Sequence, residues 1–134
     1  AMAHALGHSM GAVLGIPHGR AVGLCLPYTI EFTLRGWLPT RYAEIARFLG
    51  LPASDETEGV ASLVSAIRDL ARRIDQPLTL QEAGVSKAEF EAGFSRLVDN
   101  ALNDSTMTVS LRFPEDEEVE KIFRCIYEGV PVDF

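Results

Sequence analysis

Helical periodicity is the feature that most constrains how this chain can fold. Across residues 60–74, apolar side chains recur at three- and four-residue steps, which is the spacing of an amphipathic helix. This stripe consists of Val60, Leu63, Val64, Ile67, Leu70, Ala71 and Ile74. Ser86 and Glu89 have the spacing of a helix-capping box, and a similar stripe follows them. Another follows the acidic run at 115–118. We therefore expect several helices packed around a shared apolar core.

Glycine and proline signals divide the N-terminal part of the chain into three further helices. The motif Gly-Ile-Pro at 15–17 closes a glycine-rich helix over 1–14. A second helix, apolar on nearly all sides and therefore central, is expected from residue 18 to about residue 35. A third is expected from 39 to 50, with four residues facing inward: Tyr42, Ile45, Ala46 and Leu49.

One segment of the C-terminal part departs from the helical pattern. In "STMTVSLRF" (105–113), apolar residues alternate with polar ones as they do in a strand: Met107, Val109, Leu111 and Phe113. Because nothing else in the chain offers a partner strand, we expect an extended segment packed on the helices. Six helices and no sheet predict one all-α domain, a helical bundle spanning residues 1–134.

Charge and cysteine usage limit the possible partners. The chain has 19 acidic and 12 basic residues and a net charge of −7, which argues against a nucleic-acid partner. The most apolar window, 21–34, contains a proline and a glutamate and is too short to span a membrane. Cys25 and Cys125 lack metal or redox spacing, so we expect reduced, buried thiols in a cytoplasmic protein.

All three histidines of the chain fall between positions 4 and 18. On a helix, His4 and His8 share a face with glycines at 7, 11 and 15. Glycine destabilises a helix interior by roughly 1 kcal/mol relative to alanine. Three glycines on one face therefore indicate that another helix or a bound molecule approaches closely there.

The same histidines predict part of a metal shell. Neutral imidazole is a common metal ligand, and His4 and His8 at i, i+4 spacing could chelate one ion. A tight turn at 15–17 would bring His18 toward them. Catalytic metal sites usually have three or more protein ligands, and no acidic residue lies near in sequence, so other ligands must come from elsewhere. Ordinary surface or core histidines are the alternative interpretation.

The histidine segment also resembles a known signature. "HALGHSMGAVLGIPHGRAVGLCLPYTIEF" (4–32) is similar to that of the iron-containing (group III) alcohol dehydrogenases, with its HxxxHxxG pattern and later Pro-His-Gly opening a long apolar helix. Residues 78–108 and 118–129 resemble the closing helices of that family, so the resemblance covers essentially the whole chain. Ser-Leu-Arg at 110–112 stands where many members carry Asn-Pro-Arg, which leaves the subfamily open.

The resemblance implies a fold and a set of site residues. The fold would be the C-terminal helical domain of the dehydroquinate-synthase-like and iron-containing alcohol dehydrogenases. A divalent iron, or zinc, would be held by one aspartate and three histidines, of which His4 and His18 match the last two ligands. His8 matches a non-ligating histidine near the metal and the nicotinamide, and is the implied catalytic and cofactor-binding residue. This assignment replaces the His4–His8 chelate that spacing alone suggests.

The resemblance further implies an enzyme. The parent protein would be a cytoplasmic, homo-oligomeric dehydrogenase that interconverts small alcohols with aldehydes or ketones, using NAD(P) bound to a separate N-terminal domain. We expect residues 1–134 to be its C-terminal metal-binding domain, inactive alone, because the remaining ligands and the nucleotide-binding domain would lie upstream. Two alternatives stay open: a glycerol-dehydrogenase-like or maleylacetate-reductase-like enzyme of the same superfamily, and a helical binding module without catalysis.

Overall fold

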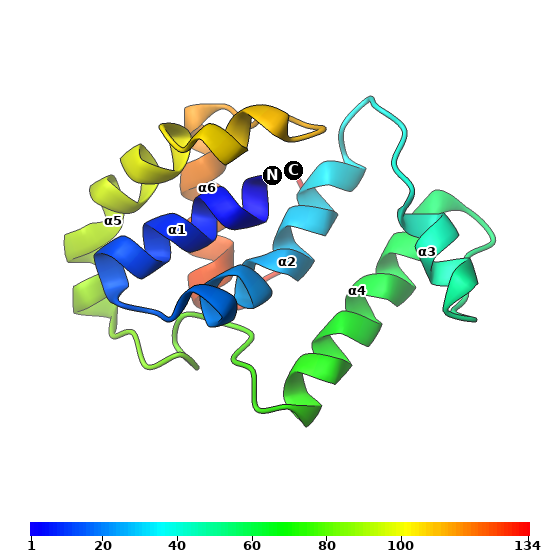
Figure 1. Ribbon diagram of the computed structural model, residues 1–134, viewed down its shortest axis with the longest axis horizontal. Helices are drawn as coiled ribbons and strands as arrows, with labels where there is room; N and C mark the ends of the chain where they lie inside the picture. Colours follow the sequence, from blue (N-terminus) through cyan, green and yellow to red (C-terminus); the bar gives the residue numbers. More distant parts are fainter.

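The computed structural model describes residues 1–134 and contains six α-helices, one 3-10 helix and no strand, which confirms the predicted all-α class (Figure 1). The bounds of the elements are α1 (Met2–Leu14), α2 (His18–Leu34), α3 (Tyr42–Phe48), α4 (Glu56–Arg73), α5 (Lys87–Leu102), η1 (Ser105–Val109) and α6 (Asp116–Glu128). The predicted boundaries at Gly15 and Gly129 are confirmed, since both glycines end their helices in the left-handed conformation.

The main core lies where α1, α2, α5 and α6 meet. Helix α1 runs between α5 and α2, and α6 passes behind it (Figure 1). The largest fully buried side chains of this core include Phe32, Phe90 and Phe123, one from each of α2, α5 and α6. Full burial of one such ring stabilises the fold by roughly 1.5–3 kcal/mol. Helix α2 is therefore central, as its all-round apolar sequence predicts.

A smaller core joins α2 to α4. It consists of Ile30, Val60 and Val64, with partly buried apolar residues around them. The predicted burial of the stripe in 60–74 is confirmed for four residues: Val60, Leu63, Val64 and Ala71. The stripe is wrong at two positions, because Leu70 is 52% and Ile74 is 64% exposed. No element of the chain covers the outer side of these two residues.

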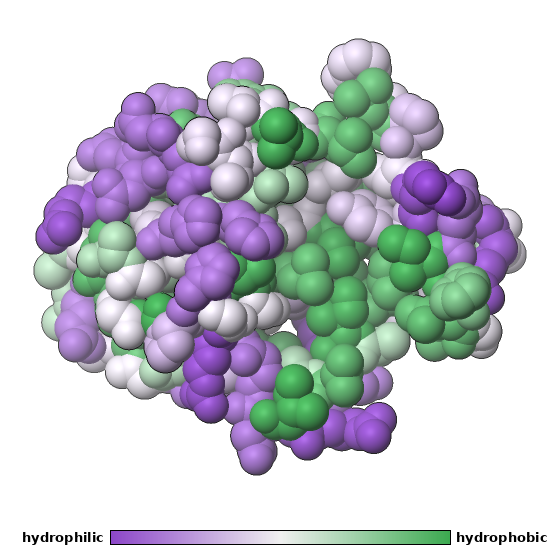
Figure 2. All heavy atoms as spheres, in the orientation of Figure 1, coloured by the Kyte–Doolittle hydropathy of each residue, from purple (hydrophilic) through white to green (hydrophobic).

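The third helix differs from its prediction. It begins at Tyr42 rather than at Pro39, and its buried residues are Ala43 and Ala46, whereas Ile45 and Leu49 are exposed. Helix α3 packs on α4 through small residues: a Cβ added to Gly59 would lie 2.7 Å from the Cα and Cβ of Ala43. Close contact through small residues leaves the large apolar side chains outside, and hydrophobic atoms gather at the α3 end in Figure 2.

The expected extended segment at 105–113 is wrong over its first half. Residues Ser105–Val109 form the 3-10 helix η1, in which Met107 is buried. Val109, Leu111 and Phe113 are exposed, so the alternating pattern does not mark one buried face. Without a partner strand, the backbone donors here are better satisfied locally, and the side chain of Asp104 accepts a hydrogen bond from the Thr106 N–H.

Close packing holds α1 in place beside its neighbours. A Cβ added to Gly7 would lie 2.7 Å from Cγ2 and 3.1 Å from the backbone nitrogen of Val22, so α2 approaches α1 at this glycine. The predicted close approach is thus made by another helix at Gly7. On the opposite side, the buried hydroxyl of Ser9 donates to the carbonyl oxygen of Leu97 at 2.7 Å and ties α1 to α5.

Both cysteines are buried and unpaired. Burial raises the pKa of the Cys25 thiol, which therefore stays protonated and behaves as a small apolar side chain. None of the helices combines the length and the apolar character that crossing a membrane requires.

Candidate metal and cofactor site

The three histidines meet at the junction of α1 and α2. The ring centroids are 5.8 Å apart for His4 and His8, 5.6 Å for His4 and His18, and 5.1 Å for His8 and His18. His4 and His8 come from successive turns of α1. The left-handed Gly15 and the buried Ile16 reverse the chain, so that α2 opens with His18 beside them. The predicted convergence of the three side chains is confirmed.

The rings of this histidine cluster are not equivalent. His8 and His18 are stacked with an interplanar angle of 22°, whereas His4 is tilted by 50° to His18. Two imidazoles on one tetrahedral ion, with bonds of about 2.1 Å, place their centroids roughly 5 Å apart. All three pairs of rings are therefore spaced as two imidazole ligands of one ion would be.

The cluster opens to solvent. All three histidines are exposed, so their free ring nitrogens can be reached from outside the chain. The donor chemistry fits divalent iron or zinc, for which imidazole is a suitable ligand. However, no group of three or more His, Cys, Asp or Glu side chains in this chain is arranged to hold a metal ion. The residues present therefore fit part of a ligand set, to be completed by groups from outside the chain.

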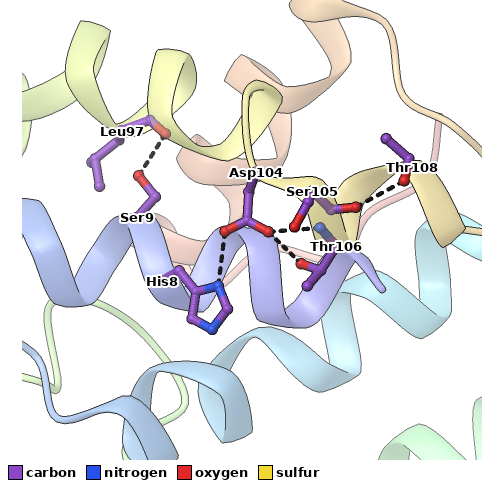
Figure 3. Close-up of polar contacts among 7 residues, drawn as sticks. All are labelled: His8, Ser9, Leu97, Asp104, Ser105, Thr106 and Thr108. Carbon is purple, nitrogen blue, oxygen red and sulfur yellow. Dashed lines mark hydrogen bonds and ion pairs between the residues drawn. The ribbon is translucent and has the colours of Figure 1, made fainter.

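A carboxylate that sequence reasoning missed lies beside the cluster. Asp104, between α5 and η1, places Oδ2 2.8 Å from Nδ1 of His8 (Figure 3). Its other oxygen, Oδ1, accepts from the backbone N–H of Thr106 at 2.8 Å and from the Thr106 hydroxyl at 2.6 Å. Asp104 is thus both the cap of η1 and the partner of His8.

These hydrogen bonds keep Asp104 ionised. The Thr106 hydroxyl and, to a lesser extent, His8 lower the pKa of the Asp104 carboxyl to about 2, against the raising effect of partial burial. An ionised carboxylate can only accept hydrogen bonds. His8 therefore donates its Nδ1–H to Asp104, so that Nε2 is the unprotonated nitrogen whenever the ring is neutral.

The contribution of Asp104 to stability should disappear at low pH. The pKa of Asp104 lies below its ordinary value of 3.8, so folding favours the carboxylate, and this stabilisation is complete above about pH 5 and lost as the pH falls toward 2. We expect Asp104→Asn to lower the free energy of unfolding by on the order of 1 kcal/mol at about pH 6, and by much less near pH 2.5. Urea denaturation of both proteins at the two pH values measures this difference. An equal loss at both would contradict it.

Comparison with known proteins decides the family. Residues 1–127 match the family model described as the C-terminal part of the Fe-containing alcohol dehydrogenase family. The chain belongs to this family. The match includes the whole histidine cluster and Asp104, so the cluster is part of the family's own domain and the predicted resemblance is confirmed.

Several characterised proteins resemble this chain in sequence. An NADPH-dependent butanol dehydrogenase of Clostridium saccharobutylicum is 36% identical over 131 residues, which are 98% of this chain and 34% of the relative. A 1,3-propanediol dehydrogenase of Citrobacter freundii is 30% identical over 127 residues, covering 90% of this chain and 30% of the relative. The chain thus spans about a third of the length of these relatives.

Solved structures of the family share the fold. A structure of 1,3-propanediol oxidoreductase superposes with a TM-score of 0.82 at 26% identity, over 95% of this chain and 32% of the other. An alcohol dehydrogenase from Oenococcus oeni gives a TM-score of 0.79 at 29% identity, over 93% of this chain and 32% of the other. The predicted bundle of the iron-containing alcohol dehydrogenase fold is confirmed.

Proposed function

We propose that residues 1–134 form the C-terminal metal-binding domain of an NAD(P)-dependent alcohol dehydrogenase that interconverts small alcohols with aldehydes or ketones. The observation that carries this proposal is the exposed cluster of three imidazoles at the α1–α2 junction. Family membership and relatives named as butanol and 1,3-propanediol dehydrogenases support the alcohol substrate class. The nucleotide-binding region would lie in the part of the enzyme outside this chain.

His4 and His18 are the proposed metal ligands of this domain. Their centroid separation of 5.6 Å suits two imidazoles on one ion. The family description names iron, and imidazole also suits zinc. When bound, the metal supplies Lewis-acid polarisation of the substrate oxygen, and NAD(P) supplies the hydride acceptor or donor.

His8 is the proposed catalytic and cofactor-binding residue. Its ring lies 5.1 Å from that of His18, and its Nδ1 is bound to Asp104, so Nε2 is its free nitrogen beside the two proposed ligands. Oxidation of an alcohol to a carbonyl compound releases one hydride and one proton. The unprotonated Nε2 of His8 accepts that proton, directly or through a water, and returns it when the reaction runs toward the alcohol.

The function is tested on the full-length enzyme. Purified protein is loaded with Fe²⁺ or Zn²⁺, and absorbance at the NAD(P)H band is followed with 1-butanol or 1,3-propanediol. We expect metal-dependent NAD(P)H formation that a chelator abolishes and added metal restores. Loaded protein that oxidises none of these alcohols and reduces none of the matching aldehydes would overturn the proposal in favour of a non-catalytic module.

A further inference from the structure

The bond between Asp104 and His8 has a defined polarity. Asp104 is held at Oδ1 by two donors from Thr106, one of which is a backbone N–H. Both oxygens of a carboxylate can only accept hydrogen bonds, and Oδ1 is already used by the Thr106 donors. The second oxygen is consequently turned toward His8, with Oδ2 2.8 Å from Nδ1.

We propose that Asp104 is a positioning residue that fixes the His8 tautomer, with the proton on Nδ1 and the lone pair on Nε2. This inference rests on the proposed function, in which Nε2 of His8 receives the substrate proton. Figure 3 places Nε2 on the side of the ring turned away from Asp104. Neither His4 nor His18 has such an acceptor among the hydrogen bonds of the structure, so only His8 is fixed in this way.

The elements around the pair make this arrangement rigid. Ser9 follows His8 on α1 and donates to the carbonyl oxygen of Leu97 on α5, the helix that leads into Asp104. This bond is buried, so α1 and the end of α5 stay in register. Asp104 also caps η1, where Met107 is fully buried, so its backbone is anchored on both sides. His8 thus meets a carboxylate already held in place rather than a mobile surface side chain.

A single isosteric change reverses the tautomer. In Asp104→Asn, the Thr106 N–H still selects the amide oxygen, so the amide NH₂ faces Nδ1 of His8. Nδ1 must then accept a hydrogen bond, and the proton moves to Nε2, which can no longer accept one. A serine-protease triad loses activity for the same reason when its aspartate becomes asparagine. Asn remains a good cap, so η1 and the fold are preserved.

The test uses the full-length enzyme loaded with Zn²⁺ and labelled with ¹⁵N at histidine. The His8 signals are assigned by comparison with His8→Ala and recorded at about pH 8. We expect wild type to show a protonated Nδ1 and Asp104→Asn a protonated Nε2. We also expect kcat for alcohol oxidation to fall at least about tenfold, with KM within about threefold and zinc content unchanged.

The control is Asp55→Asn, which changes another capping aspartate that accepts from the Glu58 N–H and has no histidine partner. It should leave the His8 signals and kcat as in wild type. A His8 tautomer unchanged in Asp104→Asn, or a kcat within about threefold of wild type, overturns the inference. A wild-type enzyme without alcohol oxidation would instead refute the proposed function, and the ¹⁵N signals would still decide the role of Asp104.

Discussion

Replacing His8 with alanine is expected to lower the kcat of the full-length enzyme by about 10²- to 10⁴-fold while its metal content stays near that of wild type. The reason is that Asp104 binds Nδ1 of His8 and leaves Nε2 free to accept a proton, while the proposed metal ligands are His4 and His18. Steady-state kinetics and metal analysis on the same preparation measure both quantities. The activity lost should appear in kcat more than in KM.

A matched variant separates this effect from general disturbance of the domain. Arg96 is exposed on α5 and takes no part in the histidine cluster, so Arg96→Ala should keep both kcat and metal content. If His8→Ala loses its metal together with its activity, His8 is a ligand and the proton-transfer role is wrong.

Replacing Phe32 with alanine is expected to lower the free energy of unfolding by about 3–5 kcal/mol. Phe32 is fully buried in α2 at the centre of the main core. Its ring lies 3.7 Å below the guanidinium carbon of Arg112 and 6.2 Å from the ring of Phe134, so truncation removes these contacts and leaves a cavity. Urea denaturation followed by circular dichroism measures the change.

Phe48 on α3 supplies the control, because the same residue type there is 88% exposed. Phe48→Ala should change the free energy of unfolding by no more than about 0.5 kcal/mol. Similar losses for the two variants would mean that α3 is packed against something other than solvent, or that Phe32 is not part of a tight core.

Sequence periodicity predicted where helices form better than which apolar residues they bury. The stripe at 60–74 identified α4 correctly, but Leu70 and Ile74 at its end are exposed. Periodicity records which residues share a face, whereas burial depends on whether another element covers that face. On α3 the same limit applies, since Ile45 is exposed while the less conspicuous Ala43 meets α4.

Within the site, the three histidines could be predicted and Asp104 was not. The histidines are close in sequence, and Gly-Ile-Pro signals the turn that joins them. Asp104 is separated from His8 by 96 positions, and only the packing of α1 on α5 brings them together. A local signal existed: an aspartate two residues after the end of a helix and two residues before a threonine is a capping pattern. That pattern indicates a fixed carboxylate but not its partner.

Metal analysis of the three single-histidine variants tests the assignment of the site most directly. Wild type, His4→Ala, His18→Ala and His8→Ala of the full-length enzyme are loaded with metal, dialysed and measured for metal per chain. We expect His4→Ala and His18→Ala to lose most of the ion, because each removes one ligand, and His8→Ala to retain it. If His8→Ala loses the ion while His18→Ala keeps it, the i, i+4 pair on α1 is the chelate and the proposed ligand set is contradicted.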